Sequence, residues 1–193
     1  MQRMKRIFLI LLVASSNSYS GGYFGFELGH TKFRYNSDYI VDIKEDKTSN
    51  RFLAGYAFDP YFSIEASYFD TQNFNADIDL RSSPGDPPAP IKGNFRVKNK
   101  ALAFRGSYPF TQKISAFASL GISRWDMSMD ITDYGLSDSD NGLTYPVGIG
   151  AELKYDKLTA FYVAARYLDF ETGSAVSRDI SLSTISIGIK LTP

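Results

Sequence analysis

The segment Gly55-Tyr-Ala-Phe-Asp-Pro-Tyr-Phe-Ser-Ile-Glu-Ala-Ser-Tyr-Phe-Asp70 contains two runs of alternating residues that meet at Asp59-Pro60. In each run, apolar side chains occupy every second position, and small or charged side chains lie between them. Successive side chains of a strand point to opposite faces, so this period is typical of β-structure. The segment therefore predicts two antiparallel strands joined by a tight turn.

The same period of two recurs along the chain and predicts eight strands in all. They lie at about residues 22–33, 50–58, 61–70, 95–108, 113–125, 144–155, 158–170 and 181–192. Short connections at 59–60, 109–112 and 156–157 alternate with long ones at 34–49, 71–94, 126–143 and 171–180. This alternation favours an up-and-down meander with tight turns at one end and long loops at the other.

The two faces of the predicted strands differ in kind. One face carries no charged residue at any of its 33 positions, which include Phe26, Phe104, Ile149 and Ile187. The other face is mostly Gly, Ala, Ser and Thr. It also holds eight charged residues, namely Glu27, Arg51, Glu65, Arg105, Glu152, Lys154, Arg166 and Lys190.

The width of an eight-stranded barrel decides which face points inward. Its interior has room only for side chains to fill, which suits small and charged residues better than rows of Phe, Tyr and Ile. The apolar face then points outward, and only lipid favours an apolar exterior. We therefore expect an all-β, eight-stranded antiparallel up-and-down transmembrane β-barrel. The alternative is a soluble carrier with its apolar side chains around a ligand.

The N-terminus predicts export. Three basic residues precede the apolar run 7–14, and the small polar stretch 15–20 follows it. This is typical of a signal peptide at residues 1–20, with cleavage before Gly21. The barrel domain is then 21–193, placed in the bacterial outer membrane after cleavage. Both termini are expected on the periplasmic side, with the four long connections outside.

The composition excludes several other classes of function. The chain has 193 residues, with 21 basic against 21 acidic side chains, which argues against a nucleic-acid partner. It has no cysteine and a single histidine, His30, so disulfides and a clustered zinc site are not expected. We predict no cofactor and no metal ion.

Several segments together resemble the barrel domain of the outer-membrane protein A family. They are Gly25-Phe-Glu-Leu-Gly29, the opening segment, Tyr108-Pro-Phe-Thr111, Ser119-Leu-Gly121, Arg124-Trp-Asp126, Gly150-Ala-Glu-Leu153, Ala165-Arg-Tyr167 and Ser186-Ile-Gly-Ile189. They touch all eight predicted strands, whereas the long connections show no resemblance. Larger members continue into a peptidoglycan-binding domain. We expect none here, because the chain stops at Pro193, and the terminal aromatic residue of many such barrels is missing.

The resemblance implies an ionic network in the lumen. Its matching positions are Glu65, Arg105, Glu152 and Arg166, where arginine replaces the lysine more usual on the fourth strand. In the family, exchange of partners is thought to gate a narrow pore. A network that only fills and fixes the interior is the other interpretation. The remaining inward charges are Glu27, Arg51, Lys154 and Lys190.

Three classes of function stay open. The first is a structural, surface-exposed barrel, with or without a narrow gated pore, and the second is an adhesin that binds a host or matrix ligand through its long loops. The third is a lipid A-modifying enzyme with His30 as the base, which is disfavoured because no specific serine motif accompanies it. The expected partners are outer-membrane lipid, lipopolysaccharide and the barrel assembly machinery.

Two long connections contain possible binding features. Residues 126–143 hold five aspartates, and Asp138-Ser-Asp-Asn-Gly142 is similar to the start of a calcium loop. The spacing and closing glutamate of such a loop are missing, so a solvated acidic loop is favoured over a weak divalent-ion site. Residues 71–94 contain four prolines and are predicted to form a mobile surface loop.

Overall fold

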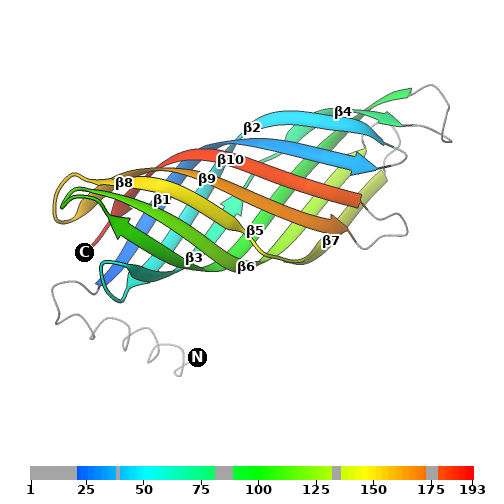
Figure 1. The fold of residues 1–193 in the computed structure, drawn as a ribbon. Helices are drawn as coiled ribbons and strands as arrows, with labels where there is room; N and C mark the ends of the chain where they lie inside the picture. The colour runs from blue at the N-terminus through cyan, green and yellow to red at the C-terminus, as the bar shows by residue number, and fades with distance from the viewer. Residues whose placement is uncertain (1–20, 38–39, 81–88, 132–135, 173–177) are drawn as a thin grey trace.

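The computed structural model describes residues 21–37, 40–80, 89–131, 136–172 and 178–193 (Figure 1). The predicted signal peptide lies outside these residues. Ten strand segments make up the fold: β1 (Gly21–Ser37), β2 (Ile40–Ala57), β3 (Phe62–Asp70), β4 (Phe74–Leu80), β5 (Ala89–Pro109), β6 (Ile114–Ile131), β7 (Leu136–Thr144), β8 (Val147–Lys154), β9 (Thr159–Thr172) and β10 (Arg178–Leu191). Within the ranges given, no helix is long and apolar enough to cross a bilayer.

The ten segments form eight strands of a closed antiparallel barrel. Segments β3 and β4 both pair with β2 and β5, so they are two parts of one wall strand. Segments β7 and β8 likewise both pair with β6. The first strand, β1, pairs with the last, β10, and this pairing closes the cylinder. The predicted fold class is confirmed.

Side-chain oxygens cap the three tight turns at the end of the barrel that holds Gly21 and the C-terminus (Figure 1). Asp59 accepts hydrogen bonds from the backbone N–H groups of residues 61 and 62, and Asp156 accepts them from residues 158 and 159. Thr111 caps residues 113 and 114 in the same way. The hydrogen bonds from the backbone hold the pKa of Asp156 below its ordinary value. These caps explain why the short connections could be located from sequence.

The prediction of four long loops is wrong for most of their residues. Strands β1 and β2 reach Ser37 and Ile40, and β6 and β7 reach Ile131 and Leu136. The proposed mobile loop at 71–94 contains all of β4 and the start of β5. Once two antiparallel strands are in register, their backbone groups continue to pair beyond the lipid-facing part. A strand beyond the lipid does not need an apolar outer face, so the pattern used to find the lipid-facing strands does not detect it.

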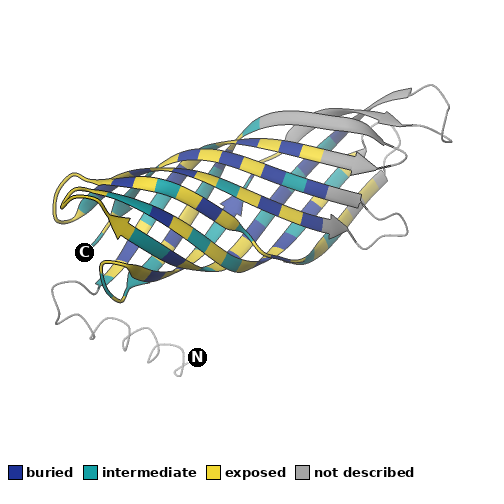
Figure 2. Ribbon diagram, viewed as in Figure 1, coloured by how far each residue is buried: buried dark blue, intermediate teal, exposed yellow. Residues whose placement is uncertain are grey.

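Exposure alternates along each strand, as Figure 2 shows. Phe104, Ile149 and Ile187 point outward and are 52%, 64% and 65% exposed, whereas Glu65 is 5% exposed. The predicted assignment of faces is therefore confirmed, and the soluble carrier with an apolar interior around a ligand is excluded. We call the outward apolar surface the apolar band. It includes Phe24, Leu28, Phe52, Phe62, Leu102, Phe104, Leu120, Ile122, Ile149, Phe161, Val163, Ile185 and Ile187.

Beyond the apolar band, at the end away from the tight turns, the two faces exchange polarity. On β5 the outward side chain changes from Leu102 to Lys100, and the inward one becomes Val97. On β6 the outward residue changes from Ile122 to Arg124, next to the buried Trp125. Such a wall, charged outside and apolar inside, is typical of a barrel in water. The exchange therefore marks where the lipid-facing wall ends.

Candidate functional site

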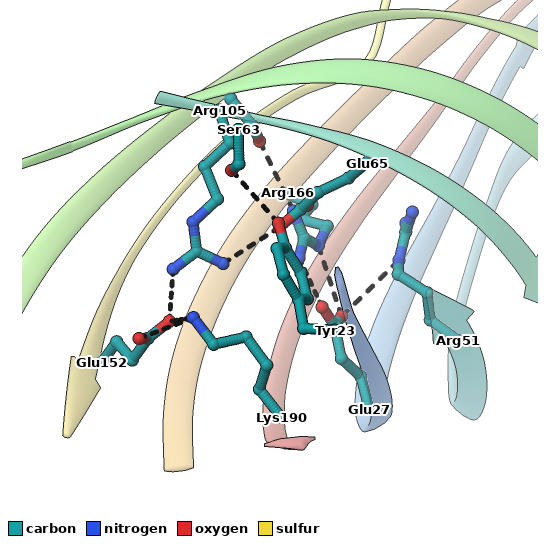
Figure 3. Close-up of polar contacts among 10 residues, drawn as sticks. Tyr23, Glu27, Arg51, Ser63, Glu65, Arg105, Glu152, Arg166 and Lys190 are labelled. Carbon is teal, nitrogen blue, oxygen red and sulfur yellow. Dashed lines mark hydrogen bonds and ion pairs between the residues drawn. The ribbon is translucent and has the colours of Figure 1, made fainter. Parts of the chain in front are cut away.

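One ionic cluster crosses the lumen near the tight-turn end (Figure 3). Arg105 of β5 lies between two carboxylates, with 3.1 Å from Nη1 to Oε1 of Glu65 and 2.6 Å from Nη2 to Oε2 of Glu152. Lys190 of β10 approaches Glu152 from the other side at 2.6 Å. Arg105, Glu65 and Glu152 are each at most 5% exposed. We call these four residues the lower cluster.

Aromatic side chains complete the lower cluster. The hydroxyl group of Tyr23 donates a hydrogen bond of 2.8 Å to Oε1 of Glu65. The Arg105 guanidinium lies 3.7 Å from the ring centroid of Phe117, and Lys190 lies 5.0 Å from that of Tyr23. Each of the two cations therefore has both an ionic partner and a close ring. This arrangement offsets part of the free energy lost on leaving water.

A second cluster is centred on Glu27 of β1, which is 1% exposed. Arg166 of β9 donates to both of its carboxylate oxygens, through Nε and Nη2. Arg51 of β2 approaches Oε2 at 3.5 Å, and the hydroxyl of Ser186 donates to the same oxygen at 3.1 Å. We call Glu27, Arg51 and Arg166 the middle cluster, because it lies farther along the barrel from the tight turns.

The structure divides the predicted quartet between these clusters. Glu65, Arg105 and Glu152 lie together, whereas Arg166 pairs with Glu27. Lys190, expected only as a further inward charge, binds Glu152 instead. Lys154 ends β8 at the rim and is exposed, so its predicted place in the lumen is wrong. Strand parity alone does not tell a rim position from a buried one.

Tyr23 is a site residue that sequence reasoning missed. It shares the inward parity of Glu27, but it lies close to the predicted cleavage site, and only charged residues were considered there. Its aromatic side chain stands on the face that otherwise carries mostly small residues, and this feature of the sequence could have identified Tyr23 as part of the lumen.

A layer of hydroxyl and amide groups lies above the middle cluster. Thr31 hydrogen-bonds Ser49 at 2.7 Å and Thr184 at 2.8 Å, and the Asn99 amide donates to Ser123 at 2.9 Å. These neutral groups join β1 to its neighbours β2 and β10, and β5 to its neighbour β6, on the inward face of the wall. The layer separates the charged half of the interior from an apolar one.

The lumen beyond this layer is filled by apolar side chains, which we call the outer cluster. Trp125 stacks on Phe170 with ring centroids 4.3 Å apart, and both are buried. The outer cluster consists of Phe33, Phe69, Phe95, Val97, Trp125, Met127, Leu168, Phe170, Ile180 and Leu182. Sequence analysis placed Met127 and Ile180 in loops and the other members in predicted strands, but it did not identify them as an apolar cluster in the lumen.

Two small cavities lie among the described side chains of the interior. A cavity of about 20 Å³ lies between the lower and middle clusters, lined by Arg51, Glu65 and Arg166 among others. Another of about 10 Å³ lies below the outer cluster. Each volume is about that of a single water molecule. A sugar or amino acid does not fit through such spaces without movement of the wall or its side chains.

The remaining candidate residues that the structure describes lie apart from the lumen clusters. His30 points outward on β1, where its cross-strand partners are Thr48 and Ile185. In the part of the chain that the structure describes, no group of three or more His, Asp or Glu residues could hold a metal ion. Asn141, within the proposed calcium segment, accepts a hydrogen bond from Arg124.

The family model of the outer membrane protein beta-barrel domain matches residues 7–192 of the chain. No curated protein matches this chain in a sequence comparison. Among solved structures, Neisserial surface protein A (NspA) is similar, with 14% identity, a TM-score of 0.67, and coverage of 90% of this chain and 99% of that one.

Two other solved structures share the fold. OprG from Pseudomonas aeruginosa has 11% identity and a TM-score of 0.67, and the match covers 91% of this chain and 97% of that chain. Ail, the attachment invasion locus protein of Yersinia pestis, solved with the heparin analogue sucrose octasulfate, has 13% identity and a TM-score of 0.53. That match covers 88% of this chain and 99% of Ail. At these identities the likeness concerns the fold.

Proposed function

Because the chain belongs to the outer membrane protein beta-barrel domain family, we propose that it is a structural, surface-exposed barrel whose lumen does not conduct solutes. Membership of this family supports a location in the bacterial outer membrane. We further propose that the tight-turn end faces the periplasm after signal-peptide cleavage. The proposal includes no enzymatic activity.

The filled lumen is the observation that carries this proposal. Two barriers lie in series along the axis, the ionic clusters and the outer cluster. Movement of Arg105 away from Glu65 would change only the lower cluster and leave Trp125 and its neighbours in place. A gate that worked by exchange of ionic partners alone would therefore still be closed. The interpretation that the network fills and fixes the interior is favoured.

A flux measurement separates the two interpretations. We expect liposomes with wild-type protein and with the Glu65→Ala/Arg105→Ala variant to swell in arabinose at the same rate as protein-free liposomes. The physical reason is that the outer cluster blocks the lumen in both. Heat-modifiable gel migration checks that each barrel is folded. Swelling above background for the folded double variant would contradict the proposal and support the gated pore.

A surface-interaction role is a second candidate, and it is favoured by the length of the strands beyond the apolar band. Segments β4 and the first part of β5 form a hairpin with paired residues from Phe74↔Phe95 to Leu80↔Ala89, beyond the apolar band. This hairpin reaches past the ends of the other strands (Figure 1). A paired hairpin is a stiffer platform for a host or matrix ligand than a free loop.

Shortening this hairpin tests the second candidate. Replacing residues 77–92 with Asn-Gly joins Ala76 to Gly93, which are cross-strand partners, and so preserves the register below. If the hairpin carries adhesion, cells that express the shortened barrel lose at least about 10-fold in binding to host cells or matrix, about 1.4 kcal/mol. Equal binding by the two proteins, at equal amounts of surface barrel, would remove this candidate.

A further inference from the structure

We propose that Lys100 and Arg124 together bind a phosphate group of an outer-leaflet lipid. The inference rests on the proposed membrane location and orientation, and it adds a partner and a site to them. It starts from two like charges that the sheet holds side by side.

Lys100 and Arg124 are direct cross-strand partners in the β5–β6 pair. Both are exposed and point outward, and the Arg124 side chain is 62% exposed. Opposite residues on antiparallel strands lie about 5 Å apart, and like charges at that distance destabilise the sheet. An anion placed between the two side chains converts this repulsion into attraction. Arginine and lysine both pair well with phosphate.

The pair lies at the boundary of the apolar band. The next outward positions toward the tight turns are Leu102 and Ile122, which are also cross-strand partners and are 50% and 44% exposed. Tyr68 is the partner of Lys100 on the other side, in β3. An amphipathic ring beside basic residues is typical of the headgroup level of a membrane. A lipid whose acyl chains cover Leu102 would thus have its headgroup near the pair.

Two acidic residues lie near the pair, one bound to another arginine and one at a longer distance from Arg124. Asp70 forms a 2.6 Å ion pair with Arg96, and the two lie one and two outward positions farther from the band than Tyr68 and Lys100, respectively. Asp126 approaches Nε of Arg124 only at 3.9 Å, and both side chains are about half exposed. Arg124 also donates to the Asn141 amide oxygen. With Lys98 included, four basic side chains share this surface with two carboxylates, so the surface retains a net positive charge.

The position favours a lipid over a dissolved anion. A free phosphate gains only the charge interaction, whereas a phosphorylated lipid also buries acyl chains against the apolar band. Attraction of anionic lipid amounts to about 1 kcal/mol for each basic side chain at a membrane surface. For two side chains, this corresponds to about a 30-fold difference in affinity.

The test compares two variants of equal charge. Lys100→Gln/Arg124→Gln removes the pair, and Lys113→Gln/Lys157→Gln removes two exposed charges at the tight-turn end. Binding of bisphosphorylated lipid A and of dephosphorylated lipid A is measured on folded barrels in neutral detergent micelles. We expect the first variant to bind bisphosphorylated lipid A about 30-fold more weakly than wild type. The second variant should bind bisphosphorylated lipid A with an affinity within about 3-fold of wild type. The first variant should bind bisphosphorylated and dephosphorylated lipid A with equal affinity.

Three outcomes would overturn the proposal. If both variants bound bisphosphorylated lipid A equally more weakly than wild type, the effect would be one of general charge. If wild type bound bisphosphorylated and dephosphorylated lipid A with equal affinity, phosphate recognition would be excluded. Competition by 10 mM inorganic phosphate or by sucrose octasulfate that abolishes wild-type binding of lipid A would point to a site for soluble anions. Failure of wild type to fractionate with membranes would overturn the proposed function itself, which is a different result.

Discussion

Replacement of Glu152 with leucine is expected to lower the free energy of unfolding by about 3 to 5 kcal/mol, because removal of one partner leaves buried charge without compensation. Glu152 is 3% exposed and contacts both Arg105 and Lys190. Arg105 keeps Glu65 in the variant, but Lys190 loses the carboxylate to which it is bound. Chemical denaturation in micelles or lipid vesicles, followed by Trp125 fluorescence, measures the change.

Two further variants separate charge from packing at Glu152. In Glu152→Leu/Lys190→Leu the unmatched cation is removed as well, so we expect the double variant to be more stable than Glu152→Leu by at least about 1 kcal/mol. Lys154→Leu changes an exposed charge on the same strand and should be within about 0.5 kcal/mol of wild type. A double variant as unstable as Glu152→Leu would show that the ionic contact contributes nothing.

Gly150→Ala is expected to cost about 3 kcal/mol, near the upper end for overpacking of a well-filled core. A Cβ atom at Gly150 would lie 2.3 Å from the carbonyl oxygen of Val163 and 2.4 Å from the ring of Phe117. The first contact is with backbone of the neighbouring strand, which moves only if the sheet moves. The second is with the ring on which Arg105 lies, so the substitution also disturbs the lower cluster.

Gly106→Ala is the matched control, because no atom lies within 4 Å of a Cβ at that position. It should leave the free energy of unfolding within about 0.5 kcal/mol of wild type. The midpoints of denaturation for both alanine variants provide the comparison. If Gly150→Ala were as stable as Gly106→Ala, the close fit of Phe117 against β8 would not matter for stability.

The same cross-strand relation between a ring and a glycine recurs in the lumen. Tyr23 lies against Gly55, and Tyr162 lies against Gly188, so that a Cβ at either glycine would meet the ring at 2.4 Å. Trp125 lies against Gly142 in the outer cluster. The small residues of the inward face, seen in the sequence only as a composition, are therefore the surfaces on which the inward rings pack. Which ring meets which glycine depends on the pairing of strands.

Local geometry let the sequence determine the class of fold and the two faces of its wall. Side chains alternate along any strand, so Phe104 and Arg105 had to lie on opposite faces whatever the rest of the chain did. The lipid-facing assignment of Phe104 and the burial of Glu27 and Glu65 follow from that alternation and from the narrow interior of eight strands.

Only the tertiary structure decided which inward residues meet and where the lumen is closed. Glu27 and Arg166 are 139 residues apart on β1 and β9, and β10 lies between these strands, so their contact depends on the register of two strand pairs and on the curvature of the wall. The outer cluster depends on strands that continue beyond the lipid, where the alternation reverses its polarity. Distances across a barrel are set by closure, a property of the whole sheet that no single segment encodes.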